Sequence, residues 1–152
     1  MYTDRITLAE EYWNIAEPYA LADKFCMHDL QNALADHLRT RQVSHFISPK
    51  WVEYVWELAE GSKMSQHALD KLHYDVVTDP GEYTVADGQY TKDFHQVVET
   101  CQPVATALIW KFIDQSKGGG KSNGKGKLQD PASMSGCVYH VHKAGEKCKA
   151  SG

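Results

Sequence analysis

Two thiols and two imidazoles lie close together near the end of this 152-residue chain. Cys137, His140, His142 and Cys148 fall within one short stretch, in the spacing C-x2-H-x-H-x5-C. Thiolate sulfur and imidazole nitrogen are ligands that a tetrahedral Zn²⁺ prefers. In an extended segment, residues i and i+2 point to the same face, so the two histidines can converge on one ion. The pattern therefore predicts a structural zinc knuckle over residues 137–152.

Two other interpretations of this stretch stay open. Cys137 and Cys148 could form a disulfide in an oxidising compartment, or the stretch could bind no metal at all. The spacing matches neither the long-loop two-Cys, two-His finger nor the retroviral-type knuckle, so it predicts no nucleic-acid role. Four protein ligands would leave zinc no open position for catalysis. Because nucleophile-elbow, phosphate-loop and dinucleotide motifs are also missing, we expect a protein that is not an enzyme.

Charge divides the chain into two parts. Residues 1–116 carry 9 Lys/Arg and 18 Asp/Glu (−9), whereas residues 117–152 carry 7 Lys and 2 acids (+5), which together give the net charge of −4. The boundary at 117–127 is rich in Gly and Lys and holds nothing apolar, which predicts a flexible basic linker over 117–136. The lysines also support a weaker alternative, a nucleic-acid or chromatin-associated protein that uses this basic tail.

The acidic part is patterned as helices. Apolar spacing predicts a helix over 8–22 that Pro18 kinks or breaks. A second helix is expected over 30–41, with Leu30, Leu34 and Leu38 on its buried face. No stretch alternates in the manner of a β-strand. We therefore expect a mainly α fold, a small helical bundle followed by the linker and the Cys/His tail.

Start and stop signals mark the remaining helices. Ser48 before Pro49 predicts a helix start, Gly61 its end, and Ser65 a cap for the next helix. The apolar residues expected on the buried faces of these two helices are Trp51, Val55, Leu58, Leu69, Leu72 and Val76. A turn at 79–81 and a polar connection over 83–90 precede a strongly periodic helix over 94–112, which Pro103 should bend or divide.

Membrane insertion and secretion are not indicated. The longest apolar run, 104–110, is far short of the roughly 20 residues that a bilayer span requires. The first residues show no basic segment followed by an apolar core, so we expect an intracellular protein, cytoplasmic or nuclear, with no membrane partner. Cys26 and Cys101 are then expected to be reduced thiols that pack as small buried apolar groups.

The string from Tyr12 to Leu34 resembles the closing helices of a BTB/POZ domain. The matching positions are Tyr19, Leu21, Ala22, Asp23, Lys24, Phe25, Leu30 and Leu34. The chain is similar in particular to BTB-containing proteins of filamentous fungi, which often end in a short Cys- and His-bearing segment. The resemblance covers about residues 8–41 and the tail. It implies that residues 1–45 are the end of a BTB/POZ domain and that 46–116 are its helical extension.

The resemblance implies an adaptor or scaffold that binds other proteins. A BTB domain begins with a strand-rich half, which nothing before Thr7 supplies, so the resemblance leads us to expect the C-terminal part or a fragment of such a protein. Homo-oligomers are expected only if that half is present. We expect a protein–protein interaction module in which Trp51, Tyr54 and Trp56 are aromatic anchors for the partner.

Overall fold

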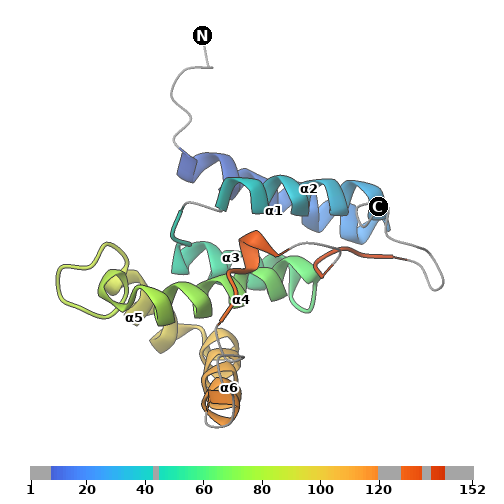
Figure 1. Ribbon diagram of the computed structural model, residues 1–152. Helices are drawn as coiled ribbons and strands as arrows, with labels where there is room; N and C mark the ends of the chain where they lie inside the picture. Colours follow the sequence, from blue (N-terminus) through green and yellow to red (C-terminus); the bar gives the residue numbers. More distant parts are fainter. Residues whose placement is uncertain (1–7, 43–44, 120–127, 135–137, 143–152) are drawn as a thin grey trace.

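A computed structural model describes residues 8–42, 45–119, 128–134 and 138–142, with side chains from residue 14 onward in the first helix. Within these ranges the chain forms six α-helices, two short 3₁₀ turns and no strand, which confirms the predicted helical bundle (Figure 1). The elements are α1 (Leu8–Lys24), α2 (His28–Gln42), α3 (Pro49–Ala59), α4 (Lys63–Thr78), η1 (Pro80–Glu82), α5 (Thr91–Thr100), α6 (Gln102–Gly119) and η2 (Pro131–Ser133).

The first two helices form a hairpin that lies over the pair α3 and α4 (Figure 1). Helix α1 continues across Pro18, so the expected break does not occur. Pro18 and Asn14, whose carbonyl would accept the missing N–H bond, are both exposed, and water can replace that bond. The hairpin turns at Cys26, which adopts a left-handed φ of 55°. Cys26 is exposed, not buried as predicted, because it sits at the tip of this turn.

Helix α2 buries a different face from the predicted one. Leu38 is buried as expected, but Leu30 is exposed and Leu34 is only partly covered. The residues that face inward are Gln31, Ala35, Leu38 and Gln42. The two glutamines are tolerated inside because each has a partner: Gln31 donates to Asp23 at 2.9 Å and Gln42 contacts His67 at 2.6 Å.

Helices α3 and α4 begin close to their predicted starts. Helix α3 starts at Pro49 after Ser48, as predicted. Helix α4 starts three residues earlier than expected, because the Ser62 hydroxyl, and not that of Ser65, caps the helix. The expected buried residues are confirmed at five positions: Trp51, Val55, Leu69, Leu72 and Val76. Leu58 is exposed, since α3 turns that side to solvent near its end.

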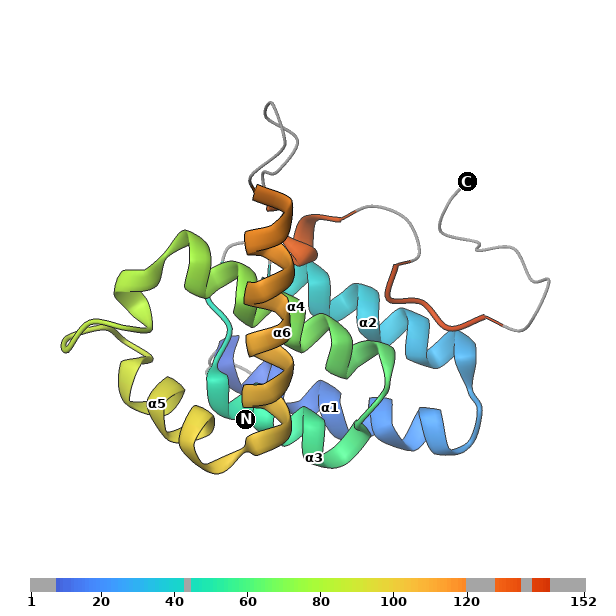
Figure 2. The ribbon, with the colours of Figure 1, turned by 90° about the horizontal axis from the view of Figure 1, so that it is seen from below.

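The long periodic stretch is two helices, as the position of Pro103 predicted. Helix α5 ends at Thr100, and α6 begins after Cys101, with Pro103 in its first turn. Figure 2 shows α6 running across α3 and α4, with which it makes contact. The core joins α6 through Val104 and Leu108. In the described part of the chain, no helix is both long and apolar enough to cross a membrane.

The C-terminal segments return to the bundle. Helix α6 extends to Gly119, so helix replaces the expected start of the linker at Lys117. Within residues 128–134, the short helix η2 (Pro131–Ser133) contacts α2 and α4 and buries Pro131 and Ala132. These residues of the predicted linker are therefore packed, whereas 120–127 and 135–137 lie outside the described residues. Beyond them, residues 138–142 run along the same side of the bundle (Figure 2).

Candidate functional site

Residues 138–142 are held on the surface shared by α2 and α4. The Tyr139 side chain is buried, and its hydroxyl donates to Asp70 Oδ2 at 2.8 Å. Its ring meets the ring of His67 edge-on, with centroids 4.7 Å apart. Burial and the neighbouring Asp70 carboxylate both raise the pKa of the Tyr139 phenol, so it stays protonated and donates. Asp70 also pairs with Lys111 of α6, which links this segment to a third helix.

Two side chains of α2, one turn apart, fix the backbone and imidazole that follow Tyr139. The Asn32 carboxamide accepts from the Val141 N–H at 2.7 Å and donates to the Val141 carbonyl at 3.0 Å. Asp36 Oδ1 lies 2.6 Å from His140 Nε2, and the His140 side chain is buried. The bundle thus contacts Val141 through its peptide groups, and it contacts Tyr139 and His140 through their side chains.

The structure describes two of the four predicted zinc ligands, His140 and His142. The rings of His140 and His142 have centroids 5.9 Å apart, so the spacing brings them together as expected. Cys137 and Cys148 lie outside the described residues. Within the described ranges, no group of three or more His, Cys, Asp or Glu side chains could hold a metal ion.

The two histidines fit a metal in two respects. His142 Nε2 is buried and has no hydrogen-bond partner among the described residues, which suits a nitrogen that a metal would engage. The Asp36 carboxylate on His140 Nε2 is the kind of partner that orients a metal-ligating imidazole. Zinc bound by these imidazoles would supply a cross-link for the tail.

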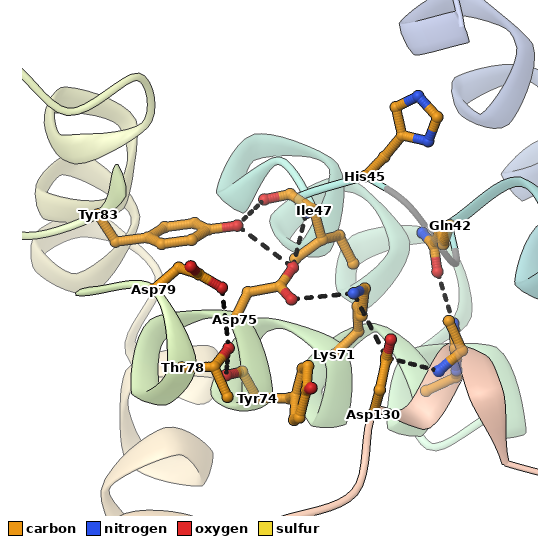
Figure 3. A network of polar contacts seen from close by, with 12 residues as sticks. Gln42, His45, Ile47, Lys71, Tyr74, Asp75, Thr78, Asp79, Tyr83 and Asp130 are labelled. Carbon is orange, nitrogen blue, oxygen red and sulfur yellow. Dashed lines mark hydrogen bonds and ion pairs between the residues drawn. The ribbon is translucent and has the colours of Figure 1, made fainter. Parts of the chain in front are cut away.

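A second cluster of polar groups is enclosed where α4 meets the bundle (Figure 3). The Lys71 ammonium lies 2.9 Å from Asp75 Oδ1 and 3.4 Å from Asp130 Oδ1, and Lys71 and Asp75 are almost fully buried. Asp75 Oδ2 accepts from the Ile47 N–H at 2.9 Å, while the Tyr83 hydroxyl donates to the Ile47 carbonyl at 2.8 Å. We name Ile47, Lys71, Asp75, Tyr83 and Asp130 the buried polar network.

The buried polar network holds segments together and leaves no surface for a substrate. Burial raises the pKa of the Asp75 carboxyl, and the charge of Lys71 and the Ile47 N–H oppose that rise. The ionised pair is therefore stable only while both partners are present. Through Asp130 the network also attaches the residues before η2 to α4. Its contacts therefore position this C-terminal segment on α4.

His67 lies beside this network and under Tyr139. Its Nε2 is 2.6 Å from Gln42 Oε1, so the ring proton lies on Nε2. Burial, reinforced by the positive charges of Arg39 and Lys71, lowers the pKa of His67 to about 3. The ring is thus neutral at ordinary pH, a state that the sequence pattern did not indicate.

The predicted aromatic anchors differ in burial. Trp51 is fully buried in the core, and a side chain with no exposed surface cannot contact a docked partner in this conformation. That residue is corrected from anchor to core. Tyr54 and Trp56 are half-buried, and the Tyr54 hydroxyl donates to Glu17 of α1 at 2.6 Å.

The sequence interpretation missed the surface that α6 exposes. Ile109 and Trp110 are 58% and 59% exposed, although both lie within the predicted periodic stretch, and Ile113 just after it is also exposed. A shallow apolar pocket of about 360 Å³ lies on this face, lined by Ile109, Phe112, Ile113, Ser116 and Lys117. We name Ile109, Trp110, Phe112, Ile113, Ser116 and Lys117 the α6 face. Apolar residues on adjacent positions such as 108, 109 and 110 were a signal, because one helix side cannot bury them all.

A second exposed apolar group lies at the tip of the α1–α2 hairpin. Its members are Leu21, Phe25, Met27 and Leu30, all at least 40% exposed. Of these four residues, Leu30 was expected on the buried face of the second helix, and its exposure corrects that expectation.

Comparison with known proteins does not extend these assignments. No family model, curated protein or solved structure matches the chain. The resemblance to BTB/POZ helices therefore stays a prediction carried by the residues from Tyr12 to Leu34 alone.

Proposed function

We propose that this chain is a protein–protein interaction module that binds an amphipathic helix of a partner protein on the α6 face. The observation that carries the proposal is the exposure of Ile109, Trp110 and Ile113 beside the apolar pocket. Exposed tryptophan and isoleucine in one contiguous group are typical of a binding surface. A pocket along one helix suits side chains spaced by a helical turn, the pattern of a helix that lies in a groove.

Charge indicates what should flank the apolar side of that partner helix. Residues 1–116 carry a balance of −9, so a partner with basic flanks would be attracted to this body. The resemblance of residues 12–34 to BTB/POZ helices supports the same class of function, because adaptors and scaffolds of that family bind other proteins. An adaptor or scaffold of BTB type is therefore our more specific proposal.

A designed peptide can test the α6 face without knowledge of the natural partner. The probe is a labelled helical peptide with leucines on one side and lysines at both ends, compared with a scrambled peptide of the same composition. We expect the helical peptide to bind the full chain and Trp110→Ser to weaken binding by about tenfold or more. Val85→Ser is the matched control, since Val85 is also exposed but lies in the loop before α5.

Two results would overturn this proposal. One is equal binding of the helical and scrambled peptides, which would indicate attraction by charge alone. The other is binding that Trp110→Ser leaves unchanged. Titration with duplex DNA at low and physiological salt separates the nucleic-acid alternative, because phosphate-driven binding weakens steeply as salt rises.

We also propose that Cys137, His140, His142 and Cys148 hold one structural zinc ion. The spacing of the four residues, the convergence of the two histidines and the buried, unpartnered His142 Nε2 support this proposal. Zinc would stabilise the tail without taking part in a reaction, because four protein ligands complete its coordination.

Metal analysis tests the zinc proposal directly. The purified chain should contain about one zinc per molecule, and Cys137→Ser should release it. Cys26→Ser is the matched control, since Cys26 is exposed and lies on the hairpin turn. Zinc-free protein whose Cys137 and Cys148 react fully with a thiol reagent would contradict the proposal, and a Cys137–Cys148 disulfide would replace it.

A further inference from the structure

The bundle already binds one polypeptide segment without helix or strand, residues 138–142 of its own chain. Asn32 contacts both the N–H and the carbonyl of Val141, two groups that a residue outside regular secondary structure leaves available. A carboxamide that pairs with one residue in this way recognises backbone and not side chain. The partners are 109 residues apart in the sequence, so the contact is not local structure.

Side-chain contacts add selectivity to the backbone contact. Tyr139 buries its ring against His67 and reaches the Asp70 carboxylate with its hydroxyl. The following residue, His140, places its Nε2 on Asp36. Phenylalanine would lose the hydrogen bond to Asp70, and a small residue would leave the His67 ring uncovered.

The α2 side chains that contact residues 138–142 could bind another peptide in place of this segment. Asp36 is 49% exposed even with His140 in place, and Asn32 is half-buried on the same side of α2. Both are polar groups that water can solvate if the segment leaves. Val138 and His142, which border the bound residues, are exposed and half-buried, so contact is concentrated on residues 139–141.

We propose that the surface between α2 and α4 is a binding groove for peptides that carry tyrosine followed by histidine, and that residues 138–142 occupy it intramolecularly. External peptides of this chemistry would then compete with the chain's own segment. The groove is distinct from the α6 face, so it adds a second site to the proposed interaction module, and either site can fail without the other.

The test uses the full chain with its own segment weakened. Tyr139→Ala combined with Val141→Pro removes the buried ring and the N–H that Asn32 accepts, and leaves every groove residue unchanged. The probe is a labelled peptide of residues 128–142 with serine at position 137. We expect it to bind this variant at least about tenfold more tightly than the wild-type chain, because the internal competitor has been weakened. Zinc is kept chelated throughout, so that metal does not contribute.

Groove variants then show where the peptide binds. Asn32→Ala in the weakened chain should reduce peptide affinity about tenfold, whereas Asn14→Ala, an exposed asparagine of α1, should leave it unchanged. A peptide with phenylalanine at position 139 should also bind more weakly. Peptide affinity that is equal for the wild-type and weakened chains, or that Asn32→Ala does not change, would overturn the proposal.

A second measurement covers the case in which the double variant fails to fold. Asn32→Ala alone, in the otherwise wild-type chain, should speed amide hydrogen exchange of residues 139–141 several-fold and leave α4 protected. Unchanged exchange at these residues would show that the Asn32 contact does not hold the segment, and would equally overturn the proposal.

Discussion

Helices α4 and α6 invert the usual distribution of polar and apolar residues. Helix α4 buries four ionisable side chains, His67, Lys71, His73 and Asp75. Helix α6, by contrast, exposes Ile109 and several neighbours that are as apolar as its buried residues. The difference follows from position: α4 contacts α3, α6, η1 and η2, whereas α6, within the described part of the chain, packs on α3, α4 and α5.

The comparison shows that the packing of neighbouring elements decides which side chains of these helices are buried. The residue type decides what that burial costs in free energy. On α4 each of the four buried ionisable side chains has a polar partner, such as Asp75 for Lys71 and Gln42 for His67. On α6 the exposed apolar groups cost little in the isolated chain and gain only when a partner covers them. The predictions below test first the polar interior of α4 and then the apolar exterior of α6.

The largest effect is expected from Asp75→Ala. This change leaves the Lys71 ammonium buried with only Asp130 at 3.4 Å, and the Ile47 N–H without its acceptor. We expect the free energy of unfolding to fall by about 3–5 kcal/mol, measured by urea denaturation. Asp114→Ala on α6 is the control, because Asp114 is exposed and should change stability by less than about 0.5 kcal/mol.

A double variant separates an uncompensated charge from a loss of packing. Lys71→Met with Asp75→Asn removes both charges and keeps an acceptor oxygen for Ile47. It should recover about half or more of the stability that Asp75→Ala loses. If the double variant is as unstable as Asp75→Ala, the loss does not come from the stranded ammonium.

Leu108→Ala should have the next largest effect. Leu108 is only 3% exposed and is the inner neighbour of Ile109 on α6. Truncation would leave a cavity where α6 meets the core, and we expect a loss of about 3 kcal/mol in urea denaturation. A loss below about 1 kcal/mol would indicate that α6 is weakly attached and that its exposed face is not set by a fixed inner face.

Acid should weaken α4 through His67. In the unfolded chain His67 takes up a proton near its ordinary pKa of 6.5, whereas in the folded chain its pKa is about 3. Between these values the unfolded state binds more protons, so stability falls as pH falls, by about 2 kcal/mol between pH 7 and pH 5. Burial lowers the pKa of His73 as well, which acts in the same direction.

The variant His67→Gln isolates this contribution. Stability curves of the wild-type chain and the variant, measured by urea denaturation at several pH values, should have different slopes below pH 6.5. His73 titrates in both proteins, so the difference in slope belongs to His67 alone. Parallel curves would mean that His67 is not held neutral in the folded chain.

Local periodicity predicted the elements but not which side of each would be covered. The division at Pro103 and the inward positions of Val55 and Leu72 follow from local geometry, and both are confirmed. The exposure of Leu30 and Leu58 could not be predicted from local geometry, because it depends on where distant helices pack. Apolar residues on two sides of a helix look the same in sequence whether or not a neighbour arrives.

The candidate sites divide in the same way. The spacing of His140 and His142 predicted that their rings would lie together, which the structure confirms, while their role as zinc ligands stays a prediction. The contact of Tyr139 with Asp70 joins residues 69 positions apart, and no spacing rule relates them. No sequence pattern marked Asn32 as a candidate site residue, because its contacts are made by a segment that folds back onto it from far along the chain.

The smallest effect on stability is expected from Ile109→Ala, one residue from Leu108. Because Ile109 is 58% exposed, its truncation removes little buried surface, and the free energy of unfolding should change by less than about 0.5 kcal/mol. The same variant should still bind the helical probe peptide several-fold more weakly, as fluorescence polarisation would show. Adjacent positions would then divide the helix into a residue that stabilises the fold and one that serves the partner. A large loss of stability from Ile109→Ala would instead show that something in the chain covers this side of α6, and the α6 face would no longer be a surface open to a partner.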